Sequence, residues 1–322
     1  MKHFFYVLFG GISAVALGIL ISIAGKSAIE KVAPVIAAMT TPVSSKDLAA
    51  SSPQLNEETS VIGLKRYVNY TASVEESLMR AATLSLPSGT VKDIGSKSYL
   101  LKNLDDGNTV AQFDTDRLLP IASLTKLITA VVADRFMEDT DKVKISKDLV
   151  TTYGNNAKFK NGEVLQVKEL FYPMLMVSSN SAAEALARAY GREKFIKEMN
   201  DFVQSIGAYR TSFVDPSGLS PDNRSTANDL VIIMEWINKN NPSIIDITKL
   251  KTKTIRNHTW TNPTKFLSWS NYGGGKNGFT DEARNTSVSL FTMGKGKDLY
   301  AVVVLGTKTR DADIVKLLGK VR

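Results

Sequence analysis

A serine and a lysine three residues apart, Ser123 and Lys126, could together carry out covalent chemistry. They open an apolar helical run that begins just after Pro120, and the i, i+3 spacing places both side chains on one face of a helix. A desolvated lysine near a second cation has a lowered pKa, so Lys126 could accept the proton of the Ser123 hydroxyl. Without such a cation, the same residues would be a helix-capping serine and a surface lysine.

Ser178-Ser179-Asn180 is a second polar cluster. It follows an apolar stretch and precedes a helical one, and at such a junction polar side chains can face a cleft. By itself the cluster could equally be a helix cap.

Lys276-Asn277-Gly278 is a third cluster, which follows three consecutive glycines and leads into Phe279 and Thr280. A strand with so few side chains would let the backbone of a substrate lie close to it. A glycine-rich loop without any chemistry would have the same composition.

Taken together and in this order, the three clusters resemble the SxxK, SxN and KTG motifs of penicillin-binding proteins and serine β-lactamases. The likeness covers roughly residues 97–320 and points to the low-molecular-mass D-alanyl-D-alanine carboxypeptidases. Other segments that resemble this family are Leu119–Ser123, Thr211–Phe213, Asp215–Leu219 and Ser225–Leu230.

The resemblance implies a role for each catalytic residue. Ser123 would be the nucleophile that is acylated, Lys126 its base, and Ser178 the group that relays a proton to the departing D-alanine. Asn180 would hydrogen-bond both Lys126 and the substrate amide. Lys276 would supply positive potential for the terminal carboxylate and keep Lys126 neutral.

The resemblance also implies that the segment Lys276–Thr280 binds the substrate, and that the backbone N–H groups of Ser123 and Phe279 form an oxyanion hole. Asn277 departs from the family pattern, which has threonine or serine at this position. An amide can donate a hydrogen bond to a carboxylate, but it is longer than a hydroxyl. The sequence therefore predicts either an enzyme with altered affinity or a non-catalytic protein that binds wall peptide.

The expected activity is that of a serine-type D-alanyl-D-alanine carboxypeptidase, which removes the terminal D-Ala from peptidoglycan stem peptides, with β-lactams as covalent inhibitors. A D,D-endopeptidase that cuts cross-links would use the same residues. A β-lactamase of the commonest class would need a Glu-x-x-x-Asn segment, and none occurs between Asn180 and Lys276. Transpeptidation is disfavoured because no glycosyltransferase domain accompanies this one.

Composition excludes several other chemistries. The chain lacks cysteine, which excludes thiolate nucleophiles, thiolate zinc sites and disulfides. Its two histidines, His3 and His258, exclude multi-histidine metal sites, and a Ser-His-Asp triad could use only His258. The net charge of +8 is compatible with lipid headgroups or an anionic wall polymer, or with a solvated lysine-rich surface. No metal, cofactor or nucleic acid is expected.

The N-terminal part divides into three segments by composition. Residues 4–24 carry no charge, and as a helix they would span ~32 Å, which matches a bilayer core of ~30 Å. This predicts a single-pass membrane anchor, or alternatively a signal peptide that is cleaved at Ser22-Ile23-Ala24. A flexible tether at 26–64 and a helical lead-in at 65–96 would precede a peptidase domain at 97–322.

The fold expected for residues 97–322 is an α/β protein of the α+β type, like the β-lactamases and D,D-peptidases. Strands at 99–103 and 109–113 and strands at 286–293 and 299–305 are expected to join in one antiparallel sheet. Helices would flank this sheet, with a helical subdomain inserted from about residue 124 to 238 and a last helix at about 311–320.

The implied substrate lies outside the cytoplasm, so the anchor is expected to have its N-terminus inside and the peptidase domain on the extracytoplasmic side. A reporter fused after Arg322 that is active only after export should therefore be active. Activity of a cytoplasm-specific reporter at the same position would reverse this topology.

Overall fold

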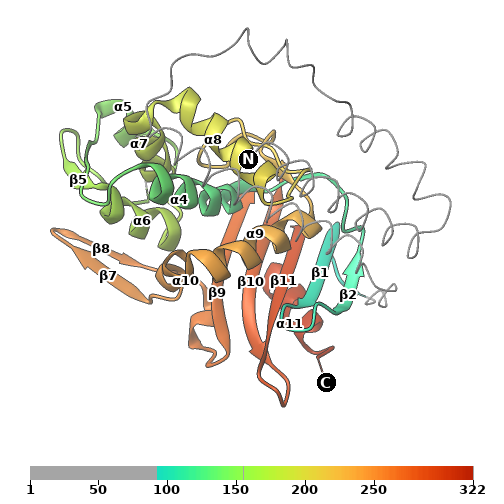
Figure 1. Cartoon of the computed structure of the whole chain (residues 1–322). Helices are drawn as coiled ribbons and strands as arrows, with labels where there is room; N and C mark the ends of the chain where they lie inside the picture. Colours follow the sequence, from blue (N-terminus) through green and yellow to red (C-terminus); the bar gives the residue numbers. More distant parts are fainter. Residues whose placement is uncertain (1–92, 155, 322) are drawn as a thin grey trace, which may run out of the picture. The chain divides into compact units, whose positions relative to one another are not determined.

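A five-stranded antiparallel sheet, with strand order β2-β1-β11-β10-β9, is the frame of the protein (Figure 1). The computed structural model describes residues 93–154 and 156–321. The sheet joins the two ends of this region, as expected from the sequence. Its strands are β1 (Ser98–Asn103), β2 (Thr109–Phe113), β9 (Tyr272–Thr280), β10 (Arg284–Met293) and β11 (Asp298–Thr307).

The first strand pairs with the last one. In the register of β1 and β11, Leu100 lies opposite Val303 and Leu101 opposite Val302. Successive side chains of a strand point to opposite faces. Leu100 and Val303 accordingly belong to one hydrophobic cluster, whereas Leu101 and Val302 belong to another.

Helices cover both faces of the sheet. Helix α9 packs with the cluster that contains Leu100, and helix α11 with the cluster that contains Leu101. Both helices contact β10 and β11. The helices are α4 (Thr125–Phe136), α5 (Lys147–Thr151), α6 (Val167–Met176), α7 (Asn180–Tyr190), α8 (Arg192–Ser205), α9 (Ala227–Asn240), α10 (Pro242–Thr248) and α11 (Arg310–Leu318), with 3-10 turns η1 (Ala122–Leu124) and η2 (Lys265–Ser268).

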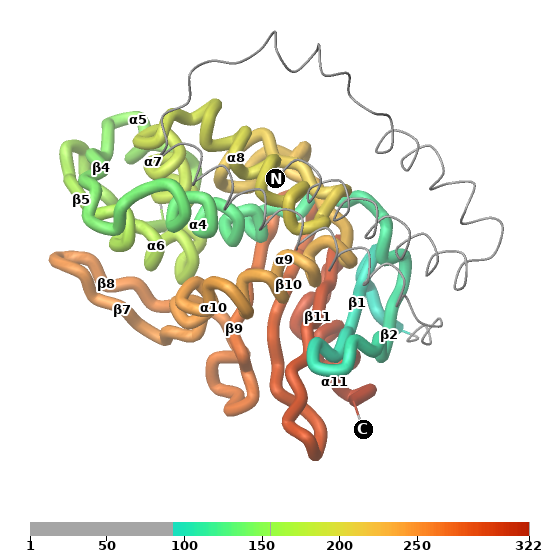
Figure 2. Tube along the Cα trace, in the orientation of Figure 1, coloured from blue at the N-terminus to red at the C-terminus, as the bar shows by residue number. Residues whose placement is uncertain are grey.

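The inserted subdomain is helical, as the sequence predicts, and Figure 2 shows α4 to α8 gathered on the β9 side of the sheet. Helix α4 is its central element, because each residue from Thr125 to Ala133 is buried. A helix that is buried on every side is one that other elements surround. The first turn of this helix carries Lys126, so its amine is inside the protein.

Three small antiparallel pairs were not expected from the sequence. Strands of two to four residues are too short to show an alternating pattern. They are β3 (Leu119–Pro120) with β6 (Arg224–Ser225), β4 (Lys142–Lys144) with β5 (Val164–Gln166), and β7 (Thr252–Ile255) with β8 (His258–Thr261).

The expected anchor at 4–24, the tether at 26–64 and all but the end of the lead-in at 65–96 lie outside the described residues. Within the described part of the chain, no helix combines the length and the apolar character needed to span a bilayer.

Asp313 links the beginning of the described region to its end. This carboxylate is buried in α11 and accepts hydrogen bonds from the hydroxyls of Ser96, Thr307 and Thr309 at 2.6 to 3.0 Å, and from Gly95 N at 3.3 Å. Four donors would be left without an acceptor if the carboxylate were lost.

Asp313→Asn should therefore destabilise the protein by about 2 kcal/mol, because an amide has only one acceptor oxygen and turns its NH₂ group toward hydroxyl donors. Urea unfolding of the two proteins measures the difference. Asp311→Asn, two residues earlier and partly exposed, is the matched control and should change the free energy of unfolding little. Equal effects of the two substitutions would contradict the role given to Asp313.

Candidate active site

Ser123 lies in the 3-10 turn η1 that leads into α4, and the amine of Lys126 points back to it. Lys126 Nζ lies 2.9 Å from Ser123 Oγ. The residue before the serine, Ala122, has a φ of 49°, in the left-handed region that residues with a side chain rarely adopt. The chain thus makes a sharp turn immediately before the serine.

Lys126 is fully buried and has three polar neighbours. Besides Ser123 Oγ, Nζ lies 2.7 Å from Asn180 Oδ1 and 2.5 Å from the backbone oxygen of Ser217. These two oxygens can only accept hydrogen bonds, whereas the hydroxyl can also donate. A neutral amine with two N–H bonds and one lone pair fits this set, with its lone pair toward Ser123.

Burial lowers the pKa of Lys126 far below its usual range, and the positive charge of Lys276 lowers it further. The negative charge of Asp215 opposes this shift. The geometry and the electrostatics thus agree on a neutral lysine that can accept the serine proton.

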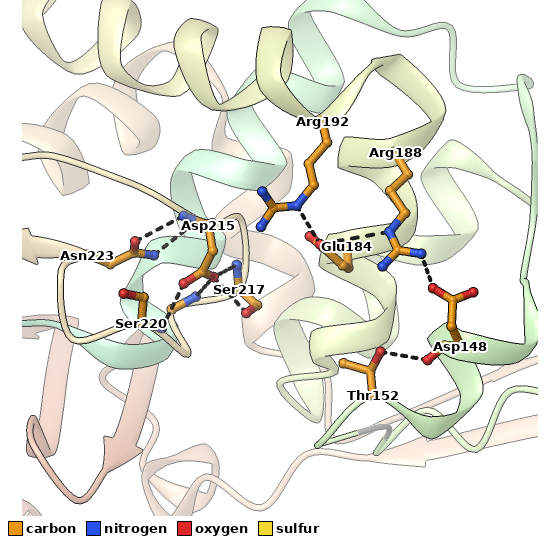
Figure 3. A network of polar contacts seen from close by, with 10 residues as sticks. Asp148, Thr152, Glu184, Arg188, Arg192, Asp215, Ser217, Ser220 and Asn223 are labelled. Carbon is orange, nitrogen blue, oxygen red and sulfur yellow. Dashed lines mark hydrogen bonds and ion pairs between the residues drawn. The ribbon is translucent and has the colours of Figure 1, made fainter.

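Asp215 organises the loop that presents the Ser217 carbonyl to Lys126 (Figure 3). Its Oδ1 accepts hydrogen bonds from Ser217 N, Ser217 Oγ and Gly218 N, and its Oδ2 accepts one from Ser220 N. Burial by itself would raise the pKa of Asp215, but these hydrogen bonds outweigh it and the pKa is lowered. Asn223 braces the same loop through hydrogen bonds to Val214 N, Asp215 N and Asp215 O.

Asn180 is the first residue of α7, and its side chain spans two elements. Oδ1 accepts from Lys126, and Nδ2 donates to the backbone oxygen of Tyr153 at 2.8 Å. A second network in Figure 3 links α7 to α5, where Arg188 bonds Asp148, and to α8, where Glu184 accepts from Arg192.

Ser178 and Lys276 form a second pair of hydroxyl and amine. Lys276 Nζ lies 3.0 Å from Ser178 Oγ and 2.9 Å from the backbone oxygen of Asn277. Burial, with a contribution from the positive charge of Arg310, lowers the pKa of Lys276 to about 7. Ser178 itself has a φ of 60°, another left-handed residue in the site.

Strand β9 lies against the backbone of the serine at Gly278. A Cβ atom on this residue would lie 2.8 Å from Ser123 N and 2.6 Å from Thr286 Oγ1. Only glycine permits this contact, which brings the strand beside the backbone N–H of Ser123. The next residue, Phe279, has an exposed side chain.

Two of the residues expected to bind substrate have other partners in the structure. The Asn277 side chain contacts Ser287 and Thr264, and it is the backbone oxygen of Asn277 that contacts Lys276. Thr280 Oγ1 accepts a hydrogen bond from Ala283 N in the turn after β9. The Thr280 hydroxyl is therefore part of this turn.

His258 is not a partner of Ser123. Its Nε2 lies 2.6 Å from Glu163 Oε1, and its ring stacks on Trp260 and meets the edge of Phe159.

Three residues of the site were not predicted from the sequence: Asp215, Asn223 and Arg310. Asp215 does lie in the segment Asp-Pro-Ser-Gly, 215–218, whose composition is typical of a tight turn.

The sequence of this chain is similar to those of known proteins of one family. A family model described as D-alanyl-D-alanine carboxypeptidase matches residues 83–309. The D-alanyl-D-alanine endopeptidase of Escherichia coli (strain K12) is 31% identical over 253 residues, which cover 74% of this chain and 80% of that protein. The D-alanyl-D-alanine carboxypeptidase DacA of the same strain is 30% identical over 246 residues, covering 71% of this chain and 61% of that protein.

Among solved structures, penicillin-binding protein D2 from Listeria monocytogenes, in a cefotaxime-bound form, is similar with a TM-score of 0.62 and 25% identity. The match covers 72% of this chain and 99% of that one.

The two buried lysines predict a bell-shaped pH profile for acylation of Ser123 by a β-lactam. The rate rises with pH as Lys126 loses its proton, and it falls above about pH 7 as Lys276 loses the charge that attracts a carboxylate. Lys276→Arg stays charged, so its profile should keep the rising limb and lose the falling one. Acylation rates from intact-mass spectrometry check this; a falling limb in the variant contradicts it.

Proposed function

This chain belongs to the D-alanyl-D-alanine carboxypeptidase family, and we propose that it removes the terminal D-Ala from peptidoglycan stem peptides through an acyl-enzyme on Ser123. The observation that carries this proposal is the environment of Lys126. A fully buried amine with two acceptors and one hydroxyl around it is suited to take a proton from that hydroxyl.

In the acylation step, Ser123 Oγ attacks the carbonyl carbon of the D-Ala-D-Ala bond while its proton passes to Lys126 Nζ. The carbonyl oxygen becomes an oxyanion, which the backbone N–H groups of Ser123 and Phe279 would stabilise. The C–N bond then breaks, and the departing D-alanine receives a proton through Ser178. The contact of Ser178 with Lys276 supports this relay, because the amine can resupply the hydroxyl.

The carboxylate that ends the substrate requires positive charge near the leaving group. Lys276 supplies it, and Arg310 is near enough for its charge to lower the pKa of Lys276. A bound carboxylate would favour the protonated form of Lys276, so substrate binding and protonation of this lysine support each other. Asn277 would add one hydrogen bond through its amide.

In the second step, water attacks the ester carbonyl carbon and gives up a proton that returns through Ser178 to Lys276. Lys126 returns its proton to Ser123 Oγ as the ester bond breaks, so the acid is released and the enzyme is regenerated. A β-lactam would acylate the same serine. This expectation is supported by the similar penicillin-binding protein D2 from Listeria monocytogenes, whose structure contains bound cefotaxime. We expect the β-lactam adduct to be long-lived, since the sequence contains no Glu-x-x-x-Asn segment after Asn180 that would activate a deacylating water.

A D,D-endopeptidase is the second candidate function. The chain covers 80% of the Escherichia coli endopeptidase but 61% of the carboxypeptidase DacA, at nearly equal identity. The same serine and lysine would cut a cross-link in which the amine of a neighbouring stem peptide is the leaving group. A third possibility, a non-catalytic protein that binds wall peptide, depends on the Asn277 substitution alone.

The proposed enzyme acts at the cell membrane, with the peptidase domain on the extracytoplasmic side. Support for this placement comes from the uncharged segment 4–24 and from a substrate that is a wall polymer.

Mass spectrometry of the purified protein with a pentapeptide ending in D-Ala-D-Ala, and separately with a cross-linked muropeptide, tests the proposal. We expect loss of one alanine from the pentapeptide, and a stable penicillin adduct on Ser123. Ser123→Ala should abolish both. Cleavage of the cross-linked substrate alone would establish the endopeptidase, whereas penicillin labelling without cleavage of either substrate would favour the binding protein.

A further inference from the structure

A chain of buried hydroxyl groups runs behind Asn277, on strands β9 and β10. Ser287 Oγ donates a hydrogen bond to Asn277 Oδ1 at 2.8 Å, and Ser287 Oγ lies 3.1 Å from Ser289 Oγ. Both serines are buried.

The register of the two strands creates this chain. Asn277 lies directly opposite Ser287, and Gly275 directly opposite Ser289, so all four are on the same face of the sheet. A Cβ atom on Gly275 would lie 2.8 Å from Ser289 Oγ. The glycine thus leaves the space in which the Ser289 hydroxyl lies.

The direction of the hydrogen bonds follows from the amide. Asn277 Oδ1 can only accept, so Ser287 uses its single O–H group to donate to it. The contact between the two serines then has Ser289 Oγ as the donor and Ser287 Oγ as the acceptor.

The hydrogen bond from Ser287 holds the amide of Asn277 in one orientation. Its Oδ1 is occupied by Ser287, so the NH₂ group faces the other way. Among the described residues, the hydrogen-bond partner of Nδ2 is Thr264 Oγ1 at 3.5 Å, the limit of a hydrogen bond. Nδ2 is therefore a donor with capacity left for a ligand.

We propose that Ser287 is a positioning residue for substrate recognition, whose hydroxyl holds Asn277 with Nδ2, and not Oδ1, toward the carboxylate that ends the substrate. The inference rests on the proposed function. It explains how asparagine can serve where the family has threonine or serine: a hydroxyl can rotate to donate, whereas an amide must be held in one of two orientations.

The test compares acylation of Ser123 by a β-lactam that has a free carboxylate with acylation by its methyl ester. In Ser287→Ala the amide is free to turn its oxygen toward the carboxylate. We expect acylation by the free acid to slow about 3- to 10-fold, the effect of one lost hydrogen bond, and acylation by the ester to change less than about twofold. Ser287→Thr, which keeps the hydroxyl, should restore the rate with the free acid.

Two further variants separate positioning from a structural role. In an Asn277→Thr background there is no amide to orient, so Ser287→Ala should then change the free-acid rate less than about twofold. Ser289→Ala removes only the donor to Ser287, and it should slow the free acid in the same direction by a smaller factor. Ser243→Ala, which removes a surface hydroxyl 2.7 Å from Asn241 Oδ1, is the matched control and should change neither rate.

The outcomes distinguish this inference from the proposed function. If the wild type is acylated by both compounds and Ser287→Ala slows them equally or not at all, the inference is wrong while the proposed function stands. If the wild type forms no adduct with either compound, the proposed function fails and the inference fails with it.

Discussion

The enclosure of one amine inside the protein is the constraint on which the rest of this structure depends. Lys126 would be protonated in water, and a protonated lysine cannot act as a base. Helix α4 buries it, the Ser217 carbonyl and the Asn180 amide bind its N–H groups, and Lys276 adds a second positive charge nearby. Each of these contributions comes from a different segment, so the fold must be complete before the base exists.

The same constraint explains the glycines and left-handed residues around the site. Ala122 and Ser178 adopt positive φ values, and Gly218 and Gly278 each lie against the backbone of the turn that carries Ser123. Strained backbone of this kind costs about 1–3 kcal/mol per residue and persists where surrounding contacts hold it. The Asp215 loop supplies such contacts on one side, and strand β9 supplies them on the other.

The sequence predicted those parts of the site whose chemistry is local. Ser123 and Lys126 lie within one helical turn, and the sheet strands rich in valine and leucine lie within two residues of their expected limits. The missed features depend on pairings between distant segments. The backbone oxygen of Ser217 carries no residue-type signal, and the contact of Ser287 with Asn277 depends on the β9–β10 register, which shifts at a bulge near Leu290.

The pairing of β1 with β11 has a consequence for how the chain acquires its fold. Ser98 pairs with Leu305, so a strand near the beginning of the described region can pair only after a strand near its end is available. Closing so long a loop costs entropy before any contact repays it, and proteins dominated by such contacts fold slowly. During synthesis, β1 and β2 emerge long before their neighbour and present an unpaired edge. This topology therefore favours folding after the whole chain is available, and makes the early chain dependent on protection from aggregation.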